Sequence, residues 1–151
     1  MFKGIWLEEK KKELEQKYFL YQFLKEQLDN MGKQTDAMQS AIIETQAAVN
    51  ALDEITEGAK HNALIPLGAG AFVQGKIDET DKIMIAVGSN IVVKENKDNA
   101  KKILEQRMKD IEESYSKLLK DMGSITAQIQ SILPEIESLA GEMNYSDKKG
   151  K

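Results

Sequence analysis

The chain has 151 residues, of which 30% are charged and 6% aromatic, with two prolines and no cysteine. The lack of cysteine excludes a disulfide scaffold and a cysteine-ligated zinc or iron–sulfur site. A formal net charge of −4 argues against a strongly basic nucleic-acid-binding protein. With 41% apolar residues and little proline, the composition favours long helices over a globule filled with aromatic side chains.

The N-terminal residues do not have the pattern of a targeting segment. The stretch that begins at Phe2 becomes charged at Glu8, before the apolar core of a signal peptide is complete. No run of roughly 18 apolar residues is present, so we predict no membrane-spanning helix. Together with the absence of cysteine, this leads us to expect a cytoplasmic protein.

A first periodic segment runs from about residue 7 to residue 57 and predicts a coiled-coil helix. Its heptad seam is continuous from Tyr21 to Leu52 and fails toward the N-terminus, where Lys10 and Lys17 occupy d positions. An amphipathic helix of this kind needs a partner helix, because propensity alone stabilises it little. The a positions are Leu7, Leu14, Tyr21, Leu28, Thr35, Ile42, Val49 and Thr56, and the d positions are Lys10, Lys17, Leu24, Met31, Met38, Thr45 and Leu52.

A second periodic segment, from about residue 100 to residue 143, gives a stronger coiled-coil signal. Apolar residues recur without exception at alternating spacings of four and three, and the residues between them are mostly polar or charged. A strict heptad repeat predicts a left-handed supercoil. The apolar positions are Leu104, Met108, Ile111, Tyr115, Leu118, Met122, Ile125, Ile129, Ile132, Ile136, Leu139 and Met143.

The middle of the chain has the character of short β-strands. Four apolar runs, at residues 64–67, 71–73, 83–87 and 91–93, are separated by turn-forming residues such as Gly68-Ala69-Gly70 and Gly88-Ser89-Asn90. This pattern predicts two β-hairpins. Gly58 suits the end of the first helix, and Asn96 or Asp98 suits the start of the second.

The order of elements predicts an α+β fold in which the two helices form a long antiparallel coiled coil and the two β-hairpins lie between them. We expect one domain over residues 1–151, with helices over 1–61 and 96–151 and hairpins over 62–95. Aligned seams place Leu52 near Leu104, and about 45 helical residues give an arm of roughly 65–70 Å.

Two isolated hairpins are marginal in water and leave edges exposed, so we expect hairpins of several subunits to pair with one another. A self-contained small sheet in a monomer is the alternative. The candidate subunit-assembly residues are Phe72, Val73, Ile77, Ile83, Ile85, Val87, Ile91 and Val93.

The middle segment resembles prefoldin, specifically the alpha class of archaeal-type subunits. The residues that carry the resemblance are Leu64-Ile65-Pro66-Leu67-Gly68-Ala69-Gly70 and the later Ile83-Met84-Ile85-Ala86-Val87-Gly88, each followed by a further apolar run. Two hairpins are typical of the alpha class, whereas the beta class has one. The helix–hairpins–helix layout covers the whole chain, but its specific residues cover only the middle third.

The resemblance implies an ATP-independent holdase without a cofactor. The expected assembly is a hexamer of two alpha and four prefoldin beta subunits, in which the hairpins form a β-barrel hub and six coiled-coil arms hang from it. Arm tips would hold unfolded client proteins and pass them to a group II chaperonin. The alternative is a structural, filament- or scaffold-forming protein like the gamma prefoldin of some archaea.

The helix residues near the N-terminus include more large apolar side chains than a seam can bury. The run from Tyr18 to Leu24 is apolar almost all around the helix, and an antiparallel pair buries only Tyr21, Leu24 and, at the edge, Tyr18. Surplus exposed apolar groups mark interaction surfaces. The alternative is that they pack on one another or on Met143 and Tyr145. The candidate client-binding residues are Phe2, Ile5, Trp6, Phe19, Leu20 and Phe23.

The remaining glycine, histidine and lysine motifs do not indicate an enzyme. Gly68-Ala69-Gly70 lacks the Gly-Lys-Ser/Thr continuation of a phosphate loop. The one histidine, His61, has no companion residues and suits a surface or capping role. Lys10-Lys11-Lys12 is surrounded by glutamates and forms no basic patch. We therefore predict no catalytic residue, no metal site, no nucleic-acid partner and no membrane partner.

Overall fold

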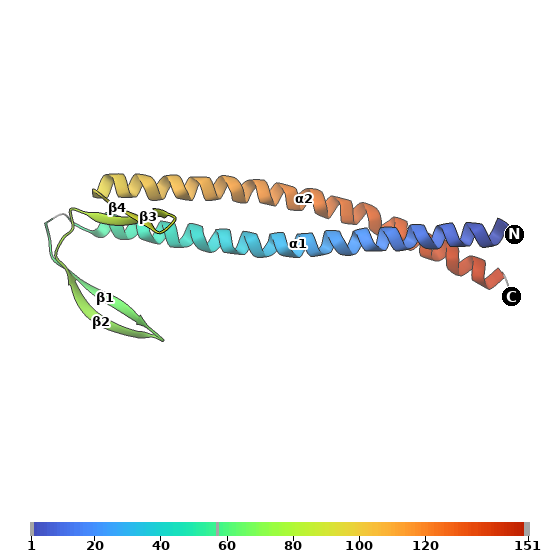
Figure 1. Ribbon diagram of the computed structural model, residues 1–151, viewed down its shortest axis with the longest axis horizontal. Coiled ribbons are helices and arrows are strands. Elements are labelled where there is room, and N and C mark those ends of the chain that lie inside the picture. The colour runs from blue at the N-terminus through green and yellow to red at the C-terminus, as the bar shows by residue number, and fades with distance from the viewer. Residues whose placement is uncertain (1, 57, 150–151) are drawn as a thin grey trace. The chain divides into compact units, whose positions relative to one another are not determined.

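A computed structural model describes residues 2–56 and 58–149. Helix, two hairpins and helix follow one another along the chain, which confirms the α+β architecture predicted from the sequence (Figure 1). Glu57, the end of the first periodic segment, lies outside the described residues. The elements are α1 (Phe2–Glu54), β1 (His61–Gly68), β2 (Ala71–Ile77), β3 (Ile83–Gly88), β4 (Ile91–Glu95) and α2 (Lys97–Lys149).

The structure divides into two compact units. We call residues up to 37 together with residues from 114 onward the terminal unit, because it contains the first part of α1 and the last part of α2. Residues 38–113 form the hairpin unit, apart from residue 57, and contain all four strands. The candidate client-binding residues therefore fall in the terminal unit, and the candidate assembly residues fall in the hairpin unit.

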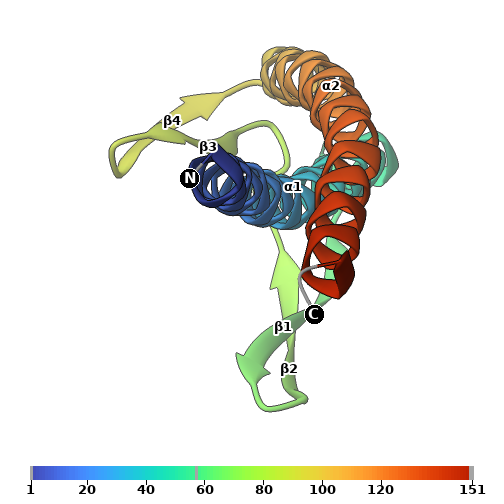
Figure 2. The same cartoon turned by 90° about the vertical axis from the view of Figure 1, so that its right-hand side faces the viewer.

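The four strands form two separate antiparallel sheets, β1–β2 and β3–β4 (Figure 2). Both hairpins are built alike. A bulge leaves Leu67 unpaired in the first hairpin and Val87 unpaired in the second, just before the turn. The two central turn residues are Ala69 and Gly70 in the first hairpin and Ser89 and Asn90 in the second. All four have positive φ, which is typical of the two-residue turn whose twist matches that of the flanking strands. The turn φ values are 107°, 48° and 78° for Gly68, Ala69 and Gly70, and 111°, 48° and 60° for Gly88, Ser89 and Asn90.

The predicted seams match the burial pattern of both helices. Every predicted apolar seam position of α2, from Leu104 to Met143, is partly or fully buried. In α1 the a and d positions between Leu7 and Leu52 are also partly or fully buried. Thr35, buried in this row, donates its hydroxyl to the Gly32 carbonyl at 2.7 Å and so carries no unpaired polar group.

The predicted failure of the seam at Lys10 and Lys17 is wrong. Both lysines are partly buried at the d positions and reach carboxylates of α2. Lys10 Nζ lies 3.4 Å from Glu142, and Lys17 Nζ donates to Glu135. A lysine stem covers apolar surface while its ammonium stays at the edge of the packing. The seam of the terminal unit thus continues as two ion pairs, spaced one heptad apart on each helix.

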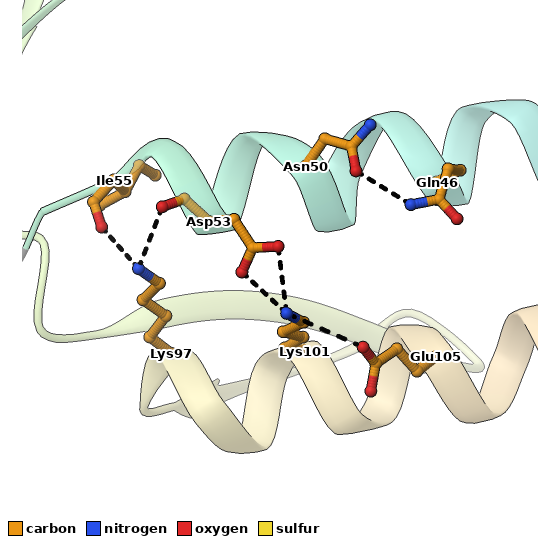
Figure 3. Close-up of polar contacts among 7 residues, drawn as sticks. All are labelled: Gln46, Asn50, Asp53, Ile55, Lys97, Lys101 and Glu105. Carbon is orange, nitrogen blue, oxygen red and sulfur yellow. Dashed lines mark hydrogen bonds and ion pairs between the residues drawn. The ribbon is translucent and has the colours of Figure 1, made fainter.

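Two lysines of α2 close the end of α1 in the hairpin unit (Figure 3). Lys97 Nζ donates to the Ile55 carbonyl at 2.7 Å, which satisfies an orphan acceptor beyond the last helical turn. Lys101 Nζ bridges both carboxylate oxygens of Asp53 at 2.9 and 3.0 Å, and this hydrogen bond raises the pKa of Lys101. The α2 N-terminus is capped as predicted, because the Asn96 side chain accepts from the amide of Asn99 at 2.8 Å.

The core of the hairpin unit lies where β3 and β4 pack on the helices. Leu52, Ile85 and Ala100 form its buried centre. Leu104 packs against this cluster, as the alignment of Leu52 with Leu104 predicts. The other side chains around it are Ile55, Ile83, Val93 and Ile103.

Candidate client-binding and assembly surfaces

An apolar surface lies on α1 in the terminal unit. All six candidate client-binding residues are exposed there, and none has found a place in the seam. Of the residues on which they could pack in the alternative, Met143 is partly buried and Tyr145 is 63% exposed. The exposed fractions are Phe2 91%, Ile5 58%, Trp6 40%, Phe19 75%, Leu20 44% and Phe23 49%.

These residues form two groups on one face of the helix. Ile5 and Phe19 are two heptads apart and occupy the same helix position, as do Trp6 and Leu20. Two heptads of α-helix are roughly 21 Å long. The intervening positions of this face are charged or polar, so the surface consists of two apolar patches. The first patch is Phe2, Ile5 and Trp6, and the second patch is Phe19, Leu20 and Phe23.

The first patch is tied to the coiled coil through Lys10. Its ammonium lies 5.9 Å from the centre of the Trp6 ring, within the range of a cation–π contact. The same ammonium is 3.4 Å from Glu142 and 3.9 Å from Glu13. Lys10 therefore joins an exposed aromatic side chain to the seam, which sequence reasoning missed because it treated this lysine as a break in the seam.

An apolar groove in the terminal unit is a second feature that sequence reasoning missed. It has a volume of about 590 Å³ and lies between α1 and the late part of α2. Tyr18, assigned from sequence to the edge of the seam, is instead half exposed and forms part of its wall. The signal in the sequence was the small Ala140, which leaves space beside Ile136. The lining residues are Leu14, Glu15, Tyr18, Phe19, Gln22, Ile136 and Ala140.

The candidate assembly residues divide into two sets. Ile85 is buried, and Ile83 and Val93 are partly buried, because the β3–β4 hairpin packs one face on the chain's own helices. Ile77 is also partly buried. The remaining residues are exposed, and further apolar side chains that the sequence analysis did not select, such as Leu64 and Met84, are exposed beside them. The exposed candidates are Phe72, Val73, Val87 and Ile91.

The β1–β2 hairpin is apolar on both faces. Ile65 and Val73 pair across the strands on one face, while Leu64 and Phe72 lie on the other, and all four are exposed. On the first face Ile65 extends over Gly75, where an added Cβ would lie 2.6 Å from Ile65 Cδ1. A larger residue at position 75 would therefore require the end of the half-exposed Ile65 side chain to move. A two-stranded ribbon with apolar side chains on both faces needs further partners to bury them.

Several other site classes find no support in the described residues. In residues 2–56 and 58–149, no group of three or more His, Asp or Glu side chains is placed to hold a metal ion. Over the same ranges no helix is long and apolar enough to cross a membrane. His61 accepts a hydrogen bond at Nε2 from the Thr56 amide at 3.2 Å, just beyond the end of α1.

Comparisons with known proteins agree with this architecture. The sequence profile of the family described as prefoldin subunit matches residues 24–142. The chain is 33% identical over 116 residues to a prefoldin subunit alpha of Methanobrevibacter smithii, covering 77% of this chain and 80% of the relative. It is 30% identical over 134 residues to a prefoldin subunit alpha of Pyrococcus horikoshii, covering 87% and 83%.

A solved structure shares the fold. The chain superposes with a TM-score of 0.63 on a cryo-EM structure of filamentous PFD from Methanocaldococcus jannaschii, at 21% identity, covering 76% of this chain and 95% of the other. Two long helices joined by two hairpins, with exposed apolar side chains on the first part of α1 and on the hairpins, define a prefoldin-type subunit. The chain belongs to the prefoldin family, whose members act as chaperone subunits.

Proposed function

We propose that the protein is the alpha subunit of an ATP-independent holdase that captures unfolded polypeptides on its terminal unit. The observation that carries the proposal is the cluster of exposed apolar side chains on α1, which includes Phe2, Ile5 and Phe19, in a member of a chaperone family. Unfolded chains expose apolar side chains, and their burial against such a surface is favourable. Several arms in one assembly would add weak contacts by avidity.

In this proposal, the hairpin unit forms the contacts between subunits. Phe72, Val73, Val87 and Ile91 supply exposed apolar surface for pairing between subunits, while Ile83, Ile85 and Val93 hold the second hairpin on its own helices. Ile77 is partly buried and is assigned to neither set. The expected partners, by the resemblance of the chain, are beta-class subunits in a hexamer of two alpha and four beta chains. In the last step of the proposed function, the bound client is released to a group II chaperonin in the cytoplasm.

A second candidate is a filament-forming structural protein built from the same hairpins. The observation that favours it is the shared fold with a subunit of filamentous PFD. At 21% identity that likeness supports the fold, so the filament remains the alternative. The two functions differ in what the purified chain does alone. A holdase subunit waits for beta-class partners, whereas a filament former polymerises without them.

Light scattering of the purified chain, alone and mixed with a beta-class prefoldin subunit, tests the proposal first. A discrete hexamer that forms only on mixing supports the holdase reading. Long polymers from the chain alone favour the filament, and a monomer under both conditions refutes the role of the hairpins. The hexamer is then added to a diluted, chemically unfolded reporter protein without ATP, where it should suppress aggregation measured by turbidity.

Transfer to a chaperonin has its own test. A labelled unfolded reporter bound to the hexamer is mixed with a group II chaperonin, and the two complexes are separated by size. Label that moves to the chaperonin fraction supports delivery. Label that stays with the hexamer leaves the holdase activity in place but refutes the delivery step.

A further inference from the structure

The β3–β4 hairpin is held on the helices of its own chain by two kinds of contact. Ile85 of β3 is buried in a cluster with Leu52 and Ala100. The next residue of the strand, Ala86, accepts a hydrogen bond at its carbonyl from Arg107 Nη2 at 2.6 Å. Arg107 follows Ala100 by one heptad and therefore lies on the same face of α2. This face of α2 thus holds β3 through a buried apolar contact and a charge-assisted hydrogen bond.

The turn end of this hairpin is loosely packed against α2. Val87, the unpaired bulge residue that follows Ala86, lines a space of about 540 Å³ together with Ile103. Val87 is exposed and Ile103 is only partly buried, so these two apolar side chains do not fill the space. The Arg107 hydrogen bond, rather than close packing, therefore fastens the turn end. The other lining residues are Lys102, Gln106, Arg107 and Asp110.

The docked position of the hairpin limits the apolar surface that the chain exposes. Ile83, Ile85 and Val93 lie on the face that packs on the helices. Met84 and Val92, on the opposite face, are exposed. A released hairpin would expose both faces, as the β1–β2 hairpin already does, and a two-stranded ribbon of that kind needs partners to bury its apolar side chains. Docking therefore leaves the chain with one two-faced apolar ribbon instead of two.

We propose that Arg107 is a latch that keeps the β3–β4 hairpin closed on α2 and so prevents its inner face from pairing with a second copy of this chain. Release of the latch gives the chain two ribbons with two apolar faces each, and copies then associate through both hairpins. The latch depends only on contacts within this chain. Its effect on association rests on the proposed role of the hairpins in assembly.

Amide exchange of the full-length chain tests the latch directly. Arg107→Gln removes the charge and keeps an exposed polar side chain, and Lys109→Gln is the matched control because Lys109 is an exposed cation on the next turn of α2. An undocked two-stranded ribbon is marginal in water, so exchange in β3 and β4 reports release. Arg107→Gln should speed it about fivefold, as loss of one exposed charge-assisted hydrogen bond predicts, and should leave β1 and β2 unchanged.

Light scattering of the chain alone, over a range of concentrations, tests the effect of the latch on association. The concentration at which half of the chain is associated should fall about fivefold in Arg107→Gln, in proportion to the larger population of released hairpin. Lys109→Gln should behave like the unsubstituted chain. Unchanged exchange in β3 and β4 overturns the latch, and faster exchange with unchanged association overturns its inhibitory role. Equal effects of the two variants overturn both, because they would follow from charge alone.

A covalent tether distinguishes release of the hairpin from a general loss of stability. Because the chain has no cysteine of its own, Val87→Cys and Ile103→Cys add a unique pair to the Arg107→Gln variant, and a short bismaleimide joins them across the space that both residues line. The tethered protein should regain the exchange and association of the unsubstituted chain, whereas the same protein capped with N-ethylmaleimide should stay released. Circular dichroism checks the helix content of each form.

Persistent association of the tethered protein overturns the proposal. Hexamer formation with a beta-class prefoldin subunit is measured separately on the unsubstituted chain. A hexamer that fails to form while the exchange and tether results hold refutes the proposed function and leaves the latch in place.

Discussion

Replacing Phe2, Ile5 and Trp6 together with serine is expected to weaken client capture while the oligomer stays intact. These residues form the first apolar patch of α1, in the terminal unit, and none of them belongs to the hairpins. The substitutions remove exposed apolar atoms and the contact of Trp6 with Lys10, while the ion pair of Lys10 with Glu142 stays. The change therefore acts on the surface offered to clients and leaves the packing of the helix pair in place.

The magnitude follows from the exposed fractions of 91%, 58% and 40%. Full burial of a large apolar side chain is worth about 1.5–3 kcal/mol, so the patch offers about 3–6 kcal/mol of gross interaction per arm. Binding offsets part of this through lost freedom of the client and the side chains. A loss of about 1.4 kcal/mol weakens the dissociation constant tenfold. The variant should therefore need about ten times more protein for half-maximal suppression of client aggregation.

A matched control distinguishes the loss of a clustered apolar patch from the loss of the same kind of side chain at scattered positions. Ile43, Leu119 and Leu133 are exposed by 69%, 46% and 37%, a similar total spread over both helices. Their triple serine variant removes a comparable amount of exposed apolar surface that is not clustered. It should suppress aggregation of an unfolded reporter almost as well as the unsubstituted chain, with both hexamers confirmed by light scattering. Equal suppression by the patch variant and the control would refute the assignment of the first patch.

Three further predictions concern stability. Leu52→Ala deletes a buried side chain at the centre of the hairpin unit and should lower the free energy of unfolding by about 2–5 kcal/mol, seen as a lower urea midpoint; an unchanged midpoint would contradict the core assignment. The hydrogen bond to Glu135 raises the pKa of Lys17 above its ordinary 10.5, so the pair stabilises the fold below pH 10.5 and is lost as pH rises through the folded-state pKa. Above pH 10.5 the urea midpoint should fall more steeply than in Lys17→Met, and parallel curves would argue against the pair. Gly75→Ala should leave amide exchange in β1 and β2 almost unchanged, because the atom that its Cβ meets at 2.6 Å, Ile65 Cδ1, ends a half-exposed side chain that is free to rotate; strongly faster exchange would contradict this.

Much of the fold was predictable because its signals are local. The strict repeat from Leu104 to Met143 identifies the buried row of α2, since a helix that buries one stripe must repeat its apolar residues. Turn residues such as Gly88 mark the hairpins for a similar reason, because positive φ is open to few residue types.

The features that sequence reasoning missed depend on the partner element. Lys10 looks like a break in an apolar seam, and only the position of Glu142 on the other helix makes it a seam residue. The groove has the same origin, because Ala140 is an ordinary helix residue until Tyr18 lies across from it. Likewise, Ile85 reads as one of several strand residues, and its burial follows from the packing of its hairpin on Leu52 and Ala100. Sequence periodicity gives the face of each element but not the partner that covers it.

The repeated bulge and turn of the two hairpins have a consequence for how such a chain connects to others. Leu67 and Val87 are unpaired at equivalent places, and both turns use the same run of positive φ values. In the proposed assembly, a subunit with two ribbons of similar turn geometry joins a neighbour on each side, although only the first ribbon is exposed on both faces. Head-to-tail contacts of this kind close into a ring or continue as a helix according to the rotation at each step. Small changes in the angle between the ribbons then decide between a finite particle and a fibre, with the chemistry of the contact unchanged.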